Sequence, residues 1–473
     1  MKVLEKAKTV KKEIKVQPYK SSKYNHFFEQ NGFILAYNAY TNCFAEVTPE
    51  KYKIIKAILK DPGKFQYKTV EERKLKDDLT KGGFLVPEEL DEFELLKLQN
   101  RLGRFQQISL GLTIAPTVAC NFRCTYCFES HQKERMTKEV ETALVKFVDE
   151  KLKIVKSLNI TWFGGEPLMA LDVIERLAKS FKELCETHHV DFPPASIITN
   201  GYLLTKKRAE ILKQSNVASA QITIDGPSRI HDRRRKLANG KGTFARIIKN
   251  IKESMNIIGI MVRVNLDKTN EKYLDELYEI WRKEGLANKV PFYFGHVQAY
   301  TEVCADISSQ CFSTSDYSAL LIKKIKEAQQ QGVWLASYPS LHRSGYCTAD
   351  KFNTYTIAPS GYLFKCWGEV SDGLENSIGS LDGKKSKPVQ IKNLTRYLNW
   401  DPFEKDDCKK CNILPICAGG CPYTHLNPAA PTTGDCSFWK YNLHDMLRLK
   451  YDALQRHKKI KSNKGGKHEF SDL

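Results

Sequence analysis

The sequence has no long hydrophobic run. Nowhere do its 473 residues approach the roughly 18 to 20 continuous apolar residues that a membrane helix requires. The segment from Met1 to Lys20 is charged and lacks the apolar centre of a signal peptide. These two absences argue against a membrane-spanning or exported chain, so we expect a soluble, cytoplasmic protein without a membrane partner.

Disulfides are also not expected, although the chain contains 14 cysteines. The cytosol keeps thiols reduced, so clustered cysteines in such a protein indicate metal ligands. The net charge of +19 permits attraction to an anionic partner, either a nucleic acid or an acidic peptide, and does not choose between them. Part of the excess lies in residues 456–467, which we interpret as a solvated tail rather than a binding arm.

Three cysteines, Cys120, Cys124 and Cys127, stand at the spacing CxxxCxxC just after an apolar run, with no fourth cysteine nearby. Structural zinc sites normally close with four protein ligands. An iron–sulfur cluster held by three cysteines instead leaves one iron free for an outside ligand. The spacing therefore predicts a metal site with an open position, where chemistry can take place.

Residues 1–100 form a segment with its own pattern. Short alternating stretches at 26–28 and 33–37 predict strands, 52–59 and 70–80 predict helices, and Gly82–Val86 ends the segment. This order predicts a small α+β module. It resembles the winged-helix-like modules that bind the leader of a ribosomally made precursor peptide by adding it as a strand. A structural cap on the next domain is an equally good interpretation.

From residue 101 to 300, strand and helix patterns alternate. The predicted strands are 109–116, 159–163, 195–199, 219–224, 258–265 and 290–294, with helices such as 138–155 and 173–185 between them. Repeated βα units predict a parallel sheet that is closed or nearly closed into a barrel. In such folds the functional residues collect at the carboxyl ends of the strands.

Glycine and polar residues recur at those strand ends. Gly164–Pro167 follows the second strand, Thr199-Asn200 ends the third, and Asp225 follows the fourth. Glycines let backbone approach a ligand closely, and a carboxylate can accept hydrogen bonds from a ligand ammonium group. Arg235 is placed to pair with a carboxylate. Each feature is weak alone, but their recurrence at the same end of successive strands predicts one binding site.

The cysteine motif, with an aromatic residue before its third cysteine, and these strand ends resemble the radical S-adenosylmethionine (SAM) enzymes. The resemblance covers residues 101–300 and implies a partial (β/α)6 TIM-like barrel whose 4Fe–4S cluster chelates SAM. One electron from the cluster then splits the sulfonium, and a 5′-deoxyadenosyl radical abstracts a hydrogen from an unactivated C–H bond. The SAM contacts that the resemblance implies are Tyr126, Gly164, Gly165, Glu166, Pro167, Thr199, Asn200, Asp225 and Arg235.

A second system of cysteines follows a bridging region, 301–346, that contains Cys304 and Cys311. Its seven members are Cys347, Cys366, Cys408, Cys411, Cys417, Cys421 and Cys436. Loops with little hydrophobic periodicity separate them, which predicts a small metal-stapled domain over 347–440, followed by a basic helix or tail over 441–473. The spacing alone fits zinc ions and iron–sulfur clusters about equally well as the metal groups that these cysteines bind.

The seven-cysteine spacing is similar to the SPASM extension of peptide-modifying radical SAM enzymes. This resemblance implies two auxiliary 4Fe–4S clusters, which makes three clusters in all. It assigns Cys408, Cys411, Cys417 and Cys436 to one auxiliary cluster, and Cys347, Cys366 and Cys421 to another that lies nearer the barrel. Cys304 or Cys311 could complete the nearer cluster, although both are at least as well explained as ordinary thiols. Otherwise a substrate cysteine could bind its open iron.

These features together predict a maturase that installs a cross-link, most simply a cysteine thioether, in a ribosomally synthesised, cysteine-containing precursor peptide. A donor such as flavodoxin or ferredoxin would supply electrons, and the auxiliary clusters would take up the surplus one. Alternatives with the same radical are a carbon–carbon or ether cross-link, an epimerisation, or formylglycine formation in a sulfatase. A non-catalytic, metal-stapled nucleic-acid binder is an alternative from a different class. No general base is assigned, because the acidic and tyrosine candidates near the barrel mouth are too many to rank.

Overall fold

The computed structural model describes residues 18–130, 132–299, 301–333, 338–427 and 436–462. The chain forms two compact units, Met1–Leu96 and Lys97–Leu473. The finer division of the second unit into barrel, bridge, cysteine-rich domain and tail stays a prediction. Among the described residues, no helix is both long and apolar enough to cross a membrane.

The first unit combines two small sheets with two helices. Strands β2 (Asn25–Gln30), β3 (Phe33–Asn38) and β4 (Cys43–Val47) form an antiparallel sheet in that order. Strand β1 (Tyr19–Ser21) pairs antiparallel with β5 (Leu85–Pro87), so the beginning and the end of the unit lie side by side. The helices are α1 (Pro49–Lys60) and α2 (Val70–Lys81).

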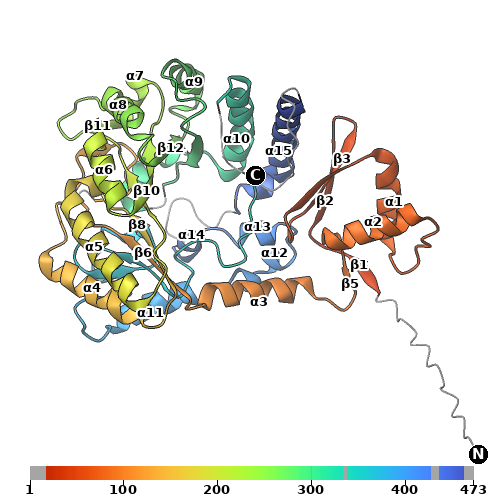
Figure 1. Ribbon diagram of the computed structural model, residues 1–473, viewed down its shortest axis with the longest axis horizontal. Helices are drawn as coiled ribbons and strands as arrows, with labels where there is room; N and C mark the ends of the chain where they lie inside the picture. Colours follow the sequence, from red (N-terminus) through yellow and green to blue (C-terminus); the bar gives the residue numbers. More distant parts are fainter. Residues whose placement is uncertain (1–17, 131, 300, 334–337, 428–435, 463–473) are drawn as a thin grey trace, which may run out of the picture. The chain divides into compact units, whose positions relative to one another are not determined.

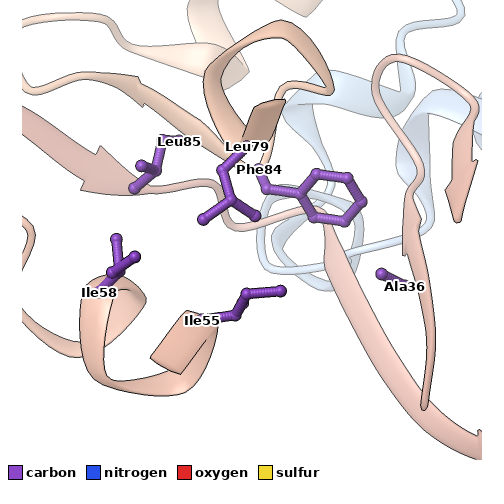
Figure 2. Packing of buried hydrophobic residues seen from close by; sticks show 6 residues of the cluster. All are labelled: Ala36, Ile55, Ile58, Leu79, Phe84 and Leu85. Atoms are coloured by element: carbon purple, nitrogen blue, oxygen red, sulfur yellow. The ribbon is translucent and has the colours of Figure 1, made fainter. Parts of the chain in front are cut away.

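Local sequence fixes where both helices begin. Thr48 caps α1 by accepting from the Lys51 amide, and Thr69 forms a capping box with Glu72 at the start of α2. The apolar sides of the helices then pack on the strands. The buried cluster, drawn in Figure 2, consists of Ala36, Ile55, Ile58, Leu79, Phe84 and Leu85. Burial of this apolar surface is what holds helices and strands together in the first unit.

The second unit is built on a nine-stranded sheet with the order β13-β12-β10-β9-β8-β6-β14-β15-β16. Figure 1 labels β6, β8, β10 and β12 of this sheet. Six parallel strands follow one another in chain order: β6 (Ser109–Ile114), β8 (Ser157–Trp162), β9 (Ala195–Thr199), β10 (Val217–Thr223), β12 (Gly259–Leu266) and β13 (Phe292–His296). They coincide with the six predicted strands, so the mostly parallel sheet is confirmed. Within the described residues β13 pairs only with β12, which leaves the sheet open as in a partial barrel.

Helices connect the successive parallel strands. They are α4 (Lys138–Leu152), α5 (Leu171–His188), α6 (Lys206–Gln214), α7 (Ser228–Arg234), α8 (Phe244–Ser254), α9 (Leu274–Lys283) and α10 (Thr314–Gln330). Their apolar sides are buried, as Leu177 and Phe181 of α5 illustrate. Because every crossover returns the chain in the same direction, the carboxyl ends of all six strands meet at one edge of the sheet.

Two strand pairings were not predicted from the sequence. Strand β7 (Phe122–Cys124), inside the first cysteine motif, pairs antiparallel with β11 (Arg235–Leu237). Strand β14 (Thr354–Ile357) pairs parallel with β6 and continues through β15 (Tyr362–Phe364) and β16 (Gly379–Ser380). Part of the predicted cysteine-rich domain is therefore an extension of the main sheet.

The remaining elements are short except for the helices α3 (Glu92–Phe105), α11 (Pro388–Leu398) and α15 (Trp439–Ser462). The short ones are α12 (Asp406–Lys409), α13 (Leu414–Cys417), α14 (Pro422–Leu426), and the 3₁₀ turns η1 (Pro167–Ala170), η2 (Glu271–Tyr273), η3 (Glu302–Gln310), η4 (Trp367–Glu369) and η5 (Pro402–Glu404). The predicted tail begins within α15, and its part from 463 to 467 lies outside the described residues.

Candidate functional site

The first cysteine motif lies in the loop that follows β6, and β11 holds this loop in place. Arg235 faces Cys124 in the β7–β11 pairing. The Thr125 amide donates to the Arg234 carbonyl at 2.9 Å, and the Ala238 amide donates to the Asn121 carbonyl at 2.8 Å. These contacts hold the backbone of the loop against β11.

The thiols of Cys120, Cys124 and Cys127 lie close enough to raise one another's pKa. Burial raises the pKa of Cys127 to about 12, and the charges of Glu129 and Cys124 raise it further. Burial likewise raises the pKa of Cys124, while the Arg235 guanidinium opposes this shift. Since cluster ligands are thiolates, a buried cation next to the three cysteines favours the form that binds iron.

Gly164 and Gly165 bring the loop after β8 against the loop that carries these cysteines. A Cβ on Gly164 would overlap the Thr117 carbonyl oxygen, and a Cβ on Gly165 would lie 2.6 Å from the Ala119 oxygen. Gly164 also has a φ of +118°, which side chains disfavour. The close approach that these glycines allow is therefore to the chain's own backbone, directly before Cys120.

The Glu166 carboxylate is fully buried and joins the turn after β8 to the end of β9. Its Oε1 accepts from the Thr199 hydroxyl at 2.7 Å and from the Leu168 amide at 3.0 Å, and its Oε2 accepts from the Asn200 amide at 2.7 Å. Burial raises its pKa, whereas these hydrogen bonds lower it. A carboxylate has about four acceptor positions, so room for a further donor remains. Pro167 opens η1 directly after it.

Asn200 connects the end of β9 to the cysteine loop. Its Nδ2 donates to Asn121 Oδ1 at 2.8 Å and lies 4.0 Å from Cys120 Sγ, while its Oδ1 accepts from the Tyr202 amide at 3.0 Å. Asn121, inside the CxxxCxxC motif, was not singled out from the sequence. Its position between two cysteines of the motif was the available signal.

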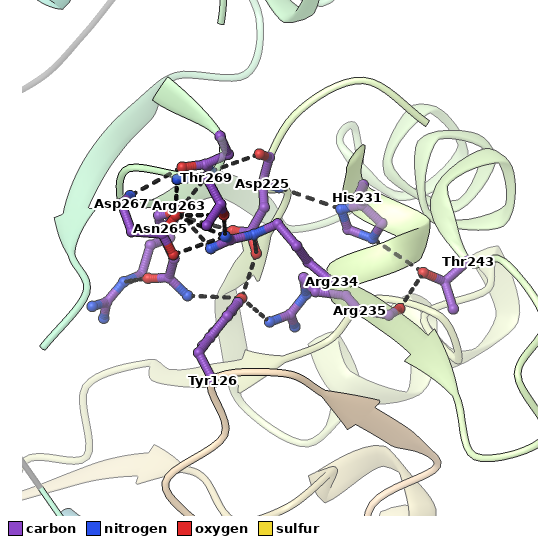
Figure 3. Close-up of polar contacts among 11 residues, drawn as sticks. Tyr126, Asp225, His231, Arg234, Arg235, Thr243, Arg263, Asn265, Asp267 and Thr269 are labelled. Atoms are coloured by element: carbon purple, nitrogen blue, oxygen red, sulfur yellow. Dashed lines mark hydrogen bonds and ion pairs between the residues drawn. The ribbon is translucent and has the colours of Figure 1, made fainter. Parts of the chain in front are cut away.

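Tyr126 is the centre of the polar network at the strand ends (Figure 3). Its hydroxyl donates to Asp225 Oδ2 at 2.5 Å and accepts from Arg235 Nη1 at 2.6 Å and from Asn265 Nδ2 at 3.1 Å. Burial raises its pKa well above the ordinary value. The aromatic residue of the motif thus ties the cysteine loop to the ends of β10 and β12.

Arg234 pairs with the buried carboxylates of this network, although the sequence analysis selected its neighbour Arg235 for that role. Arg234 Nε lies 3.3 Å from Asp225 Oδ2, and its Nη1 donates to Asp267 Oδ2 at 2.8 Å and to the Thr269 hydroxyl. Within the contacts described, Asp225 thus accepts from Tyr126 and Arg234, and its Oδ1 accepts from the Asn265 amide at 3.0 Å. Arg234 and Asp267 are the residues here that sequence reasoning missed.

Arg235 retains unused hydrogen-bonding capacity. It is 8% exposed, and among the described residues its buried Nε has no hydrogen-bond partner. A buried guanidinium beside a three-cysteine loop is a suitable site for an anionic group such as the carboxylate of SAM. The side chains present therefore fit the cofactor that the sequence resemblance implies. The individual contacts to SAM stay predictions.

His231 supports this network from α7 in its neutral form. Its Nδ1 accepts from the Asp225 amide at 3.3 Å, and its Nε2 lies 3.1 Å from the Thr243 hydroxyl, which donates to the Arg235 carbonyl. Burial lowers the pKa of His231 to about 3, and the nearby arginines lower it further. The neutral imidazole therefore holds the Asp225 amide and the Thr243 hydroxyl in place and does not act as an acid.

Cys347, Cys366 and Cys421, predicted to hold the nearer auxiliary cluster, lie within electrostatic reach of one another. Burial raises the pKa of Cys347 to about 12, and Cys421 raises it further. Burial raises the pKa of Cys366, and both other thiols raise it further. The Cys347 and Cys366 sulfurs each accept at 3.4 Å from the amide two residues ahead. Such N–H···S bonds favour thiolates and their metal complexes.

Cys408, Cys411, Cys417 and Cys436, predicted to hold the second auxiliary cluster, line one cavity of about 320 Å³. Burial raises the pKa of Cys417 to about 11, with smaller contributions from Cys411 and Cys408. Four thiols from three separate stretches of chain thus converge on one space. A metal group with four cysteine ligands fits this arrangement.

The spacing of the thiols bears on the kind of metal group. Across the described ranges, no three cysteine, histidine or acidic side chains converge tightly enough to hold a single metal ion. The cysteines of a four-iron cluster each bind a different iron and therefore lie farther apart than the ligands of one zinc ion. A four-iron cluster at the cavity with four cysteines stays a prediction.

Cys304 and Cys311 lie elsewhere, in a buried apolar cluster with Val297, Ala299 and Ile307. Cys304 Sγ donates to the Thr301 carbonyl and Cys311 Sγ to the Ile307 carbonyl, both at 3.4 Å. Tyr126 and Phe128 pack against the same cluster. This environment favours the interpretation of both residues as ordinary buried thiols.

Comparison with known proteins identifies relatives of the chain. Residues 114–280 match the family described as the Radical SAM superfamily. The chain is 30% identical over 300 residues to the sporulation killing factor maturation protein SkfB of Bacillus subtilis, covering 60% of this chain and 67% of SkfB. It is 24% identical over 440 residues to the radical SAM cyclopropyl synthase TigE of Paramaledivibacter caminithermalis, covering 83% of this chain and 87% of TigE.

A solved structure has a similar fold. It is described as native anSMEcpe with bound AdoMet and Kp18Cys peptide. The superposition gives a TM-score of 0.55 at 19% sequence identity and covers 73% of this chain and 99% of that chain. At this identity the likeness establishes the arrangement of the α/β fold around its mostly parallel sheet.

Proposed function

The chain belongs to the radical SAM superfamily and is a radical SAM enzyme, and from this premise we propose that it modifies a ribosomally synthesised precursor peptide. The modification is a cross-link, most simply a thioether between a cysteine sulfur and an acceptor carbon. SAM and one 4Fe–4S cluster belong to the family. Two auxiliary 4Fe–4S clusters and the cysteine-containing substrate are parts of the proposal.

The observation that carries this proposal is that Cys408, Cys411, Cys417 and Cys436, from three separate stretches of chain, line one cavity in the second unit. A radical reaction on one SAM molecule requires only the first cluster. A further redox group is useful when the product must lose an electron, as an oxidative cross-link does. The printed names of SkfB and TigE, a maturation protein and a synthase of a modified product, support the same class of activity.

In this proposal the residues of the site have separate roles. When bound, SAM and its cluster supply a carbon-centred radical that abstracts hydrogen. Cys120, Cys124 and Cys127 hold the cluster, and Arg235 faces the anionic part of SAM with its unpartnered Nε. Tyr126 keeps Arg235 in that position through its hydroxyl. The buried network around it excludes water from the reacting groups.

The first unit has a surface suited to holding a peptide leader. Strand β4 is at an edge of its sheet, since within the described residues it pairs only with β3, and Ala45 and Glu46 on it are exposed. An edge strand offers unpaired amides and carbonyls to an extended peptide. We therefore assign leader binding to this winged-helix-like unit; a structural cap is the alternative.

A second candidate product is a carbon–carbon bond. Its support is the similarity to TigE, a cyclopropyl synthase by name, over 83% of this chain. Both products begin with the same hydrogen abstraction. The new bond contains the cysteine sulfur in the thioether, whereas the carbon–carbon product leaves the thiol unchanged. Formylglycine formation in a sulfatase and epimerisation use the same radical and stay alternatives.

The test uses the reduced holoenzyme, SAM, and a cysteine-containing peptide from a short reading frame beside the gene. A thioether forms when the acceptor C–H and the thiol S–H are replaced by a C–S bond. The hydrogen atom goes to 5′-deoxyadenosine, the thiol proton to water, and the surplus electron to the auxiliary clusters. Mass spectrometry should show a loss of two hydrogens per cross-link, and the product should resist iodoacetamide.

The controls separate the alternatives. A loss of two hydrogens with a cysteine that still reacts with iodoacetamide would indicate a carbon–carbon bond. Turnover of SAM without any change in peptide mass would leave epimerisation, which hydrogen–deuterium exchange at the α-carbon detects. A colourless zinc protein that binds nucleic acid and cleaves no SAM would refute the proposal.

A further inference from the structure

Two lysines lie at the cavity that the four auxiliary cysteines line. Lys405 and Lys440 belong to the lining of this cavity together with Cys408 and Cys411. Lys440 Nζ donates to Cys411 Sγ at 3.9 Å. Within the described residues no ion pair joins either lysine to a carboxylate, whereas the neighbouring Lys409 pairs with Asp406 at 3.4 Å. The two ammonium groups are therefore available to the cavity.

Lys405 is held in place by two neighbouring side chains, His425 and Trp400. Its Nζ lies 3.0 Å from His425 Nδ1 and 4.7 Å from the centre of the Trp400 ring. His425 in turn stacks on Trp400 with the ring centres 4.7 Å apart, and its Nε2 lies 3.0 Å from the Gly419 carbonyl. Because Nε2 faces an acceptor it carries the proton, so Nδ1 accepts from the ammonium group. The charge of Lys405 is thus fixed at the cavity.

This charge already acts on a ligand of the cavity. Burial raises the pKa of the Cys408 thiol, Lys405 opposes that shift, and Cys411, Cys436 and Asp407 add smaller increases. Asp406 and Asp407 also line the cavity. The same physics applies to a bound cluster. Its one-electron reduction adds a negative charge to a group that four thiolates already surround, and a cation close by stabilises the more negative form. The nearer a fixed cation is to a cluster sulfur, the larger this preference becomes.

We propose that Lys405 and Lys440 are positioning residues that raise the reduction potential of the auxiliary cluster held by Cys408, Cys411, Cys417 and Cys436, and that His425 and Trp400 fix Lys405 for this purpose. The inference rests on the auxiliary cluster of the proposed function. In that reaction the cluster takes up the one electron that the product radical loses, and no bond at the cluster forms or breaks. Without the two cations this electron transfer becomes less favourable.

The test compares Lys405→Met and Lys440→Met with Lys410→Met, an exposed lysine between Cys408 and Cys411 in sequence that is not among the residues lining the cavity. The background is the full chain with the cysteines of the first motif and Cys347, Cys366 and Cys421 changed to alanine, which removes the signals of the other two proposed clusters. Electron paramagnetic resonance follows stepwise reduction with dithionite and mediators. Each cavity variant should be reduced about tenfold less favourably, a shift of about 59 mV to lower potential for one electron, and Lys410→Met should match the parent.

Further variants keep the result interpretable. Lys405→Arg retains the charge and should restore the potential, whereas His425→Phe keeps the stacking on Trp400 but removes the acceptor and should shift the potential in the same direction as Lys405→Met. Iron and sulfide contents show whether each variant still holds its cluster. Full clusters with unchanged potentials in both cavity variants would overturn the inference and leave the proposed function intact. Iron that is absent from these cysteines in the parent would overturn both.

Discussion

Arg235 faces Cys124 across the β7–β11 pairing, and the same side chain donates to the Tyr126 hydroxyl at 2.6 Å. One arginine therefore contacts the cysteine loop twice, through its backbone at Cys124 and through its guanidinium at Tyr126. Because Tyr126 also contacts Asp225 and Asn265, a shift of the cysteine loop moves the polar groups of two strands. Binding of the cluster and binding of SAM are expected to be coupled through this contact.

Removal of the Tyr126 hydroxyl should destabilise the site. In Tyr126→Phe, Asp225, Arg235 and Asn265 each lose a buried partner, and an unsatisfied buried group costs about 1–3 kcal/mol. We expect a lower free energy of unfolding in urea and weaker SAM binding by calorimetry. The matched control is Tyr293→Phe, whose hydroxyl contacts Gln221 at 2.5 Å. Equal effects of the two substitutions would contradict the central position of Tyr126.

Gly164 should not tolerate a side chain. In Gly164→Ala the Cβ overlaps the Thr117 carbonyl oxygen at a φ of +118°. Gly240→Ala isolates the backbone contribution, since Gly240 has a φ of +83° and open space around it. We expect about 1–2 kcal/mol of destabilisation at Gly240 and a further cost of about 1–3 kcal/mol from overpacking at Gly164. Iron content should also fall in Gly164→Ala alone, because the displaced loop leads into Cys120.

His231 should make the stability depend on pH. Burial lowers its pKa to about 3, so the unfolded chain binds more protons than the folded one between about pH 3 and the ordinary value near pH 6.5. Folding stability is therefore unaffected by this group above about pH 6.5 and decreases as the pH falls through that window. At pH 5 the loss amounts to about 2 kcal/mol.

Urea unfolding of the wild type and of His231→Gln at pH 7.5 and pH 5 measures this effect. Glutamine keeps an acceptor and a donor but does not titrate, so its stability should fall less between the two pH values. If both proteins lose the same free energy, another group is responsible for the acid sensitivity.

Substitution of one cysteine set should remove only the iron of the cluster that this set is predicted to hold. Three 4Fe–4S clusters correspond to about twelve irons per chain after anaerobic reconstitution. Cys408→Ala combined with Cys411→Ala should remove about four of them, and the zinc content should stay negligible. A similar loss is expected from the triple alanine variant of the first motif. Loss of all iron from either variant would show that the clusters assemble only together.

The patterns that repeat along the chain were predictable from the sequence. Six strands and the residues that follow them rest on local periodicity, and the sheet has the predicted parallel order. The division of the cysteines into cluster sets came from the family resemblance and stays a prediction. The choice between Arg234 and Arg235 was not predictable in this way. Successive side chains point in different directions, so the run of arginines does not tell which one pairs with Asp225 and Asp267.

The missed pairings have a different cause. Strands β7 and β11 contain three residues each, too few for any periodicity, and they pair across more than a hundred residues of sequence. Strand β14, with four residues, is also short, and its partner β6 lies far upstream in the sequence. Contacts of this kind depend on the completed tertiary structure, which the local pattern of residues does not encode.

The pairing of β14 with β6 also limits the order in which the protein can mature. During synthesis from the amino terminus, β6 has one uncovered edge until residues 354–357 emerge from the ribosome. Cys347 and Cys366 lie on either side of the β14–β15 hairpin that covers this edge. A nascent chain stalled before this hairpin would therefore expose a strand edge prone to aggregation.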